Sequence, residues 1–261
     1  MNNFDFYNPT RIAFGEGKIA ALDTLVPADA KVLILFGGDS ARRTGTLSEV
    51  EAALGNRQVQ LFGGIEPNPS FETLMEAVTV VQRDGIDYLL AVGGGSVIDG
   101  TKFVAAASIF DGDAWDILLK GGTNIHRALP FGSVLTLPAT GSEMNKGAVV
   151  TRKSLQAKLP FHSEHVFPQF SVLDPTKSFT LPPRQVANGV VDAFVHIVEQ
   201  YLTYPASAPV QDRFAEGLLQ TLIDIGPQAL SDPENYSVRA DLMWVATLAL
   251  NGLIGAGVPQ D

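Results

Sequence analysis

The sequence contains no cysteine. Disulfide bonds, thiolate metal sites, iron–sulfur clusters and a cysteine nucleophile are therefore excluded, so any metal must use histidine, carboxylate or water ligands. Basic residues are also few, because 18 Lys and Arg stand against 28 Asp and Glu, which gives a formal net charge of −10. Nucleic acids and anionic membranes bind basic surfaces, so we expect neither as a partner.

Long apolar runs are missing as well. A membrane-spanning helix needs about 20 consecutive apolar residues, and the longest candidate, Met243 to Val258, is interrupted by Asn251 and three glycines. The N-terminus shows no basic region followed by an apolar run, so no signal peptide is expected. Hydrophobic residues make up 46% of the chain, which is enough for a folded core. These features favour a soluble cytoplasmic protein.

Short apolar runs alternate with amphipathic stretches in the first two thirds of the chain. Strands are predicted at residues 31–36, 58–62, 87–92 and 132–137, and helices at 41–54, 70–84 and from the glycines at 93–95 to about residue 109. Strands that are apolar throughout, with helices between them, indicate a parallel sheet covered on both faces. Ligands of such α/β folds bind at the carboxyl ends of the strands.

From about Phe179 the pattern becomes helical. Helices are predicted at residues 184–203, 210–222 and 238–254, with Pro205 and Pro227 interrupting the helical pattern. We therefore expect an α/β domain over residues 1–178 and a helical domain over 179–261. The last of these helices is very apolar and would expose surface that needs a cover, so the helical domain is expected to be incomplete.

The turn after the third predicted strand is the most informative segment. The strand runs into Gly93-Gly94-Gly95-Ser96, and a helix follows. Glycines allow a phosphate to approach the backbone, and the start of a helix offers free N–H groups. Ser96 and Asp99 also have the spacing of a capping box, so an ordinary capped turn is the alternative. Three successive glycines favour a pyrophosphate site.

Two further turns are expected at the same edge of the sheet. One is Phe36-Gly37-Gly38-Asp39-Ser40, and the other covers residues 137–143, with the sequence Leu-Pro-Ala-Thr-Gly-Ser-Glu. Together the three turns provide small residues, hydroxyl groups and backbone amides. The Asp39 carboxylate is placed to accept hydrogen bonds from a ribose diol, and it would repel a 2′-phosphate.

Asp192 and His196 are four residues apart in a predicted helix, so they lie on one face. Such a pair can present a carboxylate oxygen and an imidazole nitrogen to a divalent cation. The spacing alone favours a solvated polar face, because the same stripe includes Gln185, Asn188, Gly189 and Glu199. Two ligands are also fewer than the three or four that a catalytic metal takes. His162 and His165 are expected in a surface loop.

The chain resembles the iron-containing (group III) alcohol dehydrogenases, and is most similar to their NADP-dependent aldehyde reductase and butanol dehydrogenase branch. The resemblance rests on five segments in family order, at residues 9–15, 63–69, 93–99, 137–143 and 188–199. It implies a dehydroquinate synthase-like fold, in which an α/β dinucleotide-binding domain with a parallel sheet precedes an all-helical metal-binding domain. The metal of such proteins lies between the two domains.

The resemblance also implies which residues bind the cofactor, NADP or NAD. Gly37, Gly38, Asp39 and Ser40 would surround the adenosine ribose. The residues at the pyrophosphate or nicotinamide would be Gly94, Gly95, Ser96 and Asp99. Further cofactor contacts would come from Thr136, Thr140, Ser142 and Lys158. The NADP-dependent branch usually carries a small residue where this chain has Asp39, so the choice between NADP and NAD stays open.

For the metal, Fe²⁺ or Zn²⁺, the resemblance implies Asp192 and His196 as the first two ligands and no catalytic residue beyond the ligands. The two remaining family ligands are histidines that would follow Asp261. The implied reaction is hydride transfer between NAD(P)H and an aldehyde or primary alcohol by a homodimer. One alternative is a fragment that binds the dinucleotide and catalyses little. The other alternative is a glycerol dehydrogenase-like activity, but the segments at 67–69 and 139–143 favour the alcohol dehydrogenases.

Overall fold

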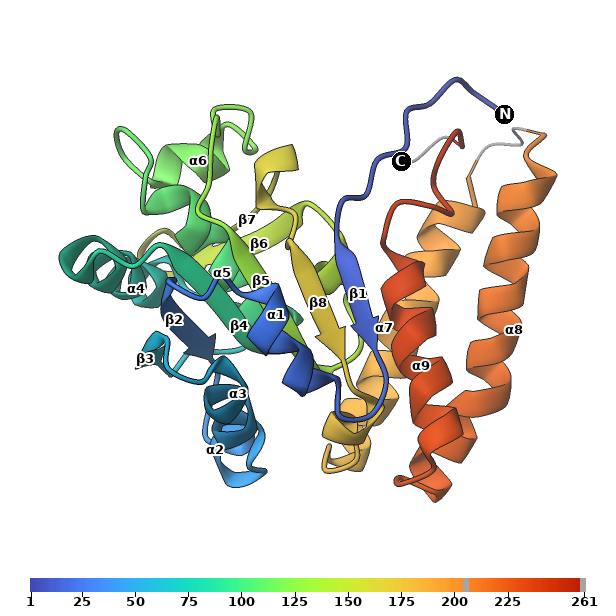
Figure 1. Ribbon diagram of the computed structural model, residues 1–261. Helices are drawn as coiled ribbons and strands as arrows, with labels where there is room; N and C mark the ends of the chain where they lie inside the picture. The colour runs from blue at the N-terminus through green and yellow to red at the C-terminus, as the bar shows by residue number, and fades with distance from the viewer. Residues whose placement is uncertain (204–206, 259–261) are drawn as a thin grey trace.

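A computed structural model describes residues 1–203 and 207–258. Its centre is a six-stranded sheet in the order β1-β8-β5-β4-β2-β3, in which every neighbouring pair is parallel (Figure 1). The strands are β1 Arg11–Phe14, β2 Lys31–Phe36, β3 Gln58–Phe62, β4 Tyr88–Gly94, β5 Phe131–Leu137 and β8 Phe170–Leu173. The predicted α/β fold with a parallel sheet is confirmed.

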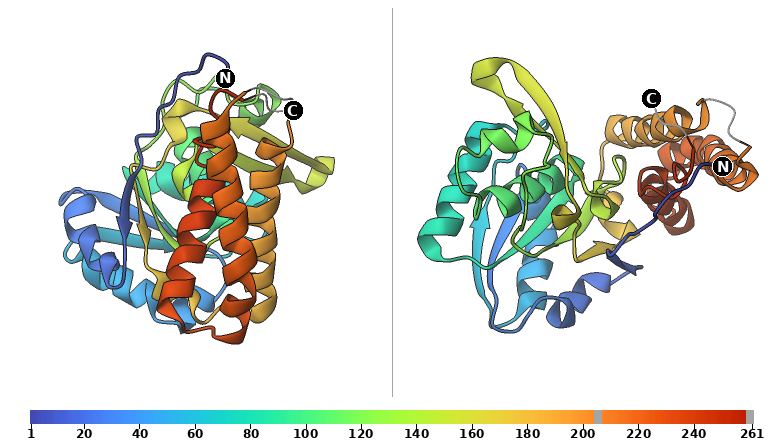
Figure 2. Two further views of the ribbon diagram at one scale, coloured as in Figure 1. Left: turned by 90° about the vertical axis from the view of Figure 1, so that its right-hand side faces the viewer. Right: turned by 90° about the horizontal axis from the view of Figure 1, so that it is seen from above.

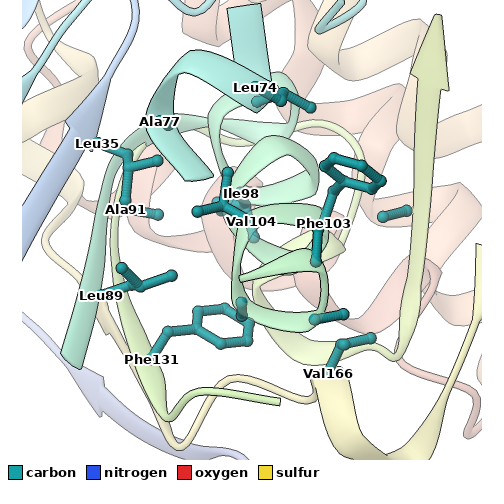
Figure 3. Close-up of a cluster of buried hydrophobic side chains, with 14 of the residues drawn as sticks. Leu35, Leu74, Ala77, Leu89, Ala91, Ile98, Phe103, Val104, Phe131 and Val166 are labelled. Atoms are coloured by element: carbon teal, nitrogen blue, oxygen red, sulfur yellow. The ribbon is translucent and has the colours of Figure 1, made fainter. Parts of the chain in front are cut away.

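Helices cover both faces of this sheet. The first face is covered by α1 Leu22–Leu25, α2 Ser40–Arg43 and α3 Thr46–Leu54, and the second by α4 Phe71–Asp84, α5 Gly95–Ala107 and α6 Trp115–Leu119. Alternate residues of β2 therefore enter different cores. Val32 and Ile34 belong to the core shared with α1 and α3, whereas Leu33 and Leu35 belong to the core shared with α4 and α5. Figure 3 shows Leu35 in this second core, beside Leu74 and Ala77 of α4. This burial on both faces explains why the strand is apolar throughout.

Some predicted elements differ in the structure. The helix expected over 41–54 consists of α2 and α3, which are separated at Thr44 and Gly45. A two-stranded antiparallel hairpin, β6 Gly147–Arg152 and β7 Ala157–His162, was not predicted, and its end overlaps the loop expected around His162 and His165. β7 contains Lys158 and Pro160 and pairs on one side only, so it lacks the apolar pattern of a buried strand.

Three long helices follow the sheet and lie side by side (Figures 1 and 2): α7 Pro183–Tyr201, α8 Pro209–Ser231 and α9 Tyr236–Ala249. They share a core that includes Ile197, Leu222 and Leu242. Pro227 does not end α8 as predicted, because burial of the neighbouring Ile225 and Ala229 in this core compensates for one missing helix hydrogen bond. Pro205 lies outside the described residues.

The last helix is more buried than the sequence suggested. α9 packs on α7 and α8 and also on the turn at residues 175–178, and both Met243 and Ala246 are completely buried. The most exposed apolar side chains of the three helices lie on α7 and α8, for example Val191 and Ile223, whereas Tyr236 and Trp244 of α9 are less exposed. Within the described residues, no helix is long and apolar enough to cross a membrane. The domain boundary at residue 178 stays a prediction.

Candidate cofactor and metal site

The parallel strands end at one edge of the sheet, and a large cleft opens there beyond β4 and β5. Its volume is about 1050 Å³. The cleft brings together segments that are far apart in the sequence. They include the turn after β4, the turn after β5, the β6–β7 hairpin and α7, represented by Gly95, Ser142, Lys158 and His196. The N-terminal residues 4–7 and residues 250–252 and 255–258 also line it.

The turn after β4 presents the start of a helix to this cleft. β4 ends at Gly94, and the 13-residue helix α5 begins at Gly95. A side chain at position 95 would overlap the Thr140 hydroxyl, so a glycine lets the turns after β4 and β5 pack together. Both Gly95 and Thr140 line the cleft. The helix start has no side-chain cap, and its N–H groups and partial positive charge suit a phosphate.

The capping box of Ser96 and Asp99, which was the alternative interpretation of this turn, does not form. Gly94 occupies the capping position, and Ser96 lies inside α5, where its hydroxyl accepts a hydrogen bond from the Asn68 N–H at 3.4 Å. The Asp99 carboxylate accepts hydrogen bonds from the Ser142 hydroxyl at 2.6 Å and from the Val149 N–H at 3.0 Å. Asp99 therefore joins α5 to the turn after β5 and to β6, and it also lines the cleft.

Lys102 is a residue of this region that the sequence analysis missed. Its side chain is completely buried, and its ammonium group donates hydrogen bonds to Ser142, Asn145 and Gly147. Burial lowers the pKa of Lys102 to about 8, and the same burial raises the pKa of Asp99. The available signal was a lysine one turn after Asp99, directly followed by the five apolar residues 103–107 of the same helix.

The β6–β7 hairpin contributes Lys158 to the cleft. Its ammonium group donates a hydrogen bond to the Asn68 side chain at 2.8 Å, and it is exposed to the cleft. His162 ends β7 and also lines the cleft, whereas His165 lies in a short turn beyond it. Both histidines are exposed, and they belong to a hairpin and its flank instead of the expected loop.

A smaller hollow of about 320 Å³ lies beyond β2 and β3. Gly37, Gly38 and Asp39 line it, together with Arg42, which the sequence analysis did not single out. The Arg42 guanidinium lies 5.3 Å from the centre of the Phe36 ring. The hollow therefore carries one carboxylate and one guanidinium. Ser40 and Thr136 line neither the large cleft nor the smaller hollow.

Helix α7 brings Asp192 and His196 to the large cleft. A side chain at Gly189 would lie 2.5 Å from the Pro138 carbonyl oxygen, so the glycine allows α7 to pack closely on the turn after β5. One and two turns later, Asp192 and His196 line the cleft, with their Oδ2 and Nε2 atoms 3.6 Å apart. The Asp192 carboxylate raises the pKa of His196.

The solvated-face interpretation is therefore only partly right. Gln185, Asn188 and Glu199 are exposed, whereas Gly189 is buried and the Asp192–His196 pair faces the cleft. The oxygen and nitrogen atoms of the pair suit a divalent cation. However, no group of three or more His, Asp or Glu side chains with metal-binding geometry occurs within residues 1–203 and 207–258.

Comparisons with known proteins agree with this arrangement. Two family models match, "Iron-containing alcohol dehydrogenase" at residues 9–175 and "Fe-containing alcohol dehydrogenase family, C-terminal" at residues 186–258. The NADPH-dependent aldehyde reductase YqhD of Escherichia coli is 62% identical over 263 residues, which cover 100% of this chain and 68% of that protein. The probable NADH-dependent butanol dehydrogenase 1 of Bacillus subtilis is 43% identical, with 100% and 68% covered.

The fold is also shared with solved structures. A crystal structure of E. coli YqhD matches with a TM-score of 0.99 and 61% identity, and the match covers 100% of this chain and 67% of that one. This chain thus spans about two thirds of the length of these relatives. The matching family models, the sequence identity and the shared fold all lead to one conclusion: the chain belongs to the iron-containing alcohol dehydrogenase family.

Proposed function

We propose that the chain forms the cofactor cleft of an NAD(P)-dependent oxidoreductase, which transfers a hydride between NAD(P)H and an aldehyde or primary alcohol. One observation carries the proposal. The uncapped start of α5 and the Asp192–His196 pair of α7 line the same cleft, so a dinucleotide and a cation-binding pair share one space. The names of the relatives, an NADPH-dependent aldehyde reductase and a probable NADH-dependent butanol dehydrogenase, support the same reaction class.

The protein's own groups would position the cofactor. The free N–H groups at the start of α5 bind the pyrophosphate, and Lys158 of the β6–β7 hairpin adds a positive charge. The adenosine ribose occupies the smaller hollow, where Gly37 and Gly38 leave room and Asp39 accepts hydrogen bonds from the ribose hydroxyls. The nicotinamide then extends into the large cleft towards α7.

Asp192 and His196 would hold the metal, Fe²⁺ or Zn²⁺. When bound, such a cation polarises a carbonyl oxygen as a Lewis acid. The pair supplies two donors where a catalytic site takes three or four, so a complete site needs further ligands. Gln200, one turn after His196, donates hydrogen bonds to the carbonyl oxygens of His196 and Ala249, and so joins α7 to the end of α9.

Binding and turnover test the proposal separately. Fluorescence titration is expected to show binding of NADPH or NADH, and elemental analysis is expected to show iron or zinc. With either metal added, an aldehyde should then cause oxidation of the reduced cofactor. Failure to bind either dinucleotide would contradict the proposal.

A second candidate is a dinucleotide-binding fragment with little activity, which the incomplete donor set favours. It predicts cofactor binding without bound metal and without turnover. The family resemblance also leads us to propose a homodimer, and sedimentation analysis would test it. A monomer at all protein concentrations would argue against that assembly.

A further inference from the structure

We propose that Lys102 is a positioning residue. From behind the wall of the large cleft, it holds residues 142–147 between α5 and the end of α9, and so sets the shape of the cofactor site. This inference deepens the proposed function and rests on it for its effect on cofactor binding. Lys102 itself is not among the residues that line the cleft.

The burial of Lys102 is the first argument. Its side chain is completely buried on α5, a helix whose neighbouring Ile98, Phe103 and Val104 belong to the hydrophobic core. An ammonium group in such surroundings is costly unless charges and hydrogen bonds compensate for its lost hydration. An apolar side chain would fill this position in the core equally well. The reason for a lysine must therefore lie in the contacts of its ammonium group.

Those contacts all lead to the cleft. The ammonium group donates to Ser142 Oγ at 2.9 Å, to Asn145 Oδ1 at 2.9 Å and to the Gly147 carbonyl oxygen at 2.7 Å. An ammonium group has three donors, and all three are used here. Each of the three acceptor residues lines the cleft. Lys102 thus fixes one continuous stretch of the wall from the protein interior.

The same wall is tied to α5 and to the helical region. Ser142 donates to Asp99, which accepts from the Val149 N–H, and so α5 is joined to β6. In the other direction, the Asn145 amide donates to the Leu250 carbonyl oxygen at 3.2 Å, directly after α9. Ala249, the last residue of α9, is connected in turn to the His196 backbone through Gln200.

Two buried carboxylates balance the charge of Lys102. Both Asp99 and Glu143 attract the ammonium group electrostatically. Glu143 is completely buried and accepts a hydrogen bond from Thr247 of α9 at 2.6 Å, which provides a second connection to the helical region. Loss of the ammonium charge would therefore disturb the segment that joins the cofactor turn to α9.

The test compares three variants with the unchanged chain. Lys102→Met removes the donors but keeps a long side chain. Val104→Ala, on the same helix, perturbs the core alone, and Lys120→Met removes an exposed lysine away from the cleft. Three quantities are measured: the Kd for NADPH and NADH by fluorescence titration, the Tm, and amide hydrogen exchange of segments 145–152 and 247–253.

Lys102→Met is expected to weaken cofactor binding about tenfold, within the range of coupling between residues of one hydrogen-bond network. It should also speed exchange in both segments. Val104→Ala should lower the Tm but leave the Kd unchanged, and Lys120→Met should change neither. A merely structural role for Lys102 predicts that both α5 variants weaken binding in proportion to their loss of stability, which would overturn the proposal.

The remaining outcomes also test the positioning role of Lys102. Unchanged affinity and unchanged exchange in Lys102→Met would overturn the positioning role while leaving the proposed function intact. If the unchanged chain binds neither cofactor, the proposed function fails. Amide hydrogen exchange of Lys102→Met then tests the positioning role by itself. Faster exchange confined to the two segments supports that role, and any other pattern contradicts it. If Lys102→Met does not fold, Asn145→Ala replaces it, with a smaller effect in the same direction.

Discussion

The cofactor side and the α7 side of the cleft differ in how many contacts hold their polar side chains in place. On the cofactor side, α5, the turn after β5 and the β6–β7 hairpin are joined by buried and partly buried hydrogen bonds around Asp99, Ser142 and Lys102. On the α7 side, Asp192 Oδ2 and His196 Nε2 lie 3.6 Å apart, and the Asp192 side chain is 44% exposed. A cofactor site can form from neighbouring turns of one sheet, whereas a metal site needs donors from several separate segments.

The largest expected effect is on the cofactor side. Gly95→Val would force a branched side chain against Thr140 and push the two turns apart. We expect it to abolish NAD(P)H binding, as measured by fluorescence titration, and to lower the Tm. Gly217→Ala is a suitable control, because a side chain there meets no atom within 4 Å. If Gly95→Val kept full affinity, this turn would not be the pyrophosphate site.

A second substitution separates the two sides. His196→Ala removes one of two donors, so iron or zinc binding by the chain should fall below detection in elemental analysis. Cofactor affinity should be unchanged, because the start of α5 lies on the other side of the cleft. Val195→Ala, which alters an exposed neighbour on the same helix, should leave the metal content unchanged. Metal content that is equal in all three proteins would show that Asp192 and His196 are not ligands.

A smaller effect is expected in the adenosine hollow. Asp39→Gly removes a negative charge beside the proposed ribose site, so it should raise the affinity for NADPH relative to NADH about tenfold, or about 1.4 kcal/mol. Arg42→Ala should shift the ratio in the opposite direction, since its guanidinium lines the same hollow. The ratio of the two Kd values measures both effects. A ratio that neither substitution changes would place the ribose elsewhere.

The smallest effect concerns the attachment of the hairpin. Burial alone would raise the pKa of Glu66, but hydrogen bonds from Lys153 and Ser70 outweigh it and lower the pKa to about 2, from 4.5. The lowered pKa contributes stability above pH 4.5, and this contribution is lost as the pH falls towards 2.

Denaturant unfolding would measure this contribution. Glu66→Gln should reduce the unfolding free energy by up to about 1 kcal/mol at neutral pH, because solvent screens the partly exposed pair with Lys153. The difference from the unchanged chain should shrink as the pH approaches 2. A difference that is constant with pH would mean that the Glu66 charge does not hold the hairpin.

The sequence determined the parallel sheet and the position of the glycine turn, since both depend on neighbouring residues. Burial on both faces makes β2 apolar throughout, and the three glycines directly follow the apolar residues of β4. Asp192 and His196 could be paired from helical spacing alone. Such patterns are local, and local geometry is what a sequence reveals most directly.

What these residues contact depends on packing between segments that are distant in the sequence. The Ser96 hydroxyl accepts from Asn68 instead of capping its own helix, Pro227 lies within α8, and Lys102 is buried against Ser142, forty positions along the chain. Whether α7 presents its polar stripe to solvent or to the cleft depends on the close packing of Gly189 on Pro138. Contacts between segments distant in sequence set burial and hydrogen bonding, and neither has a periodic pattern that a single chain displays.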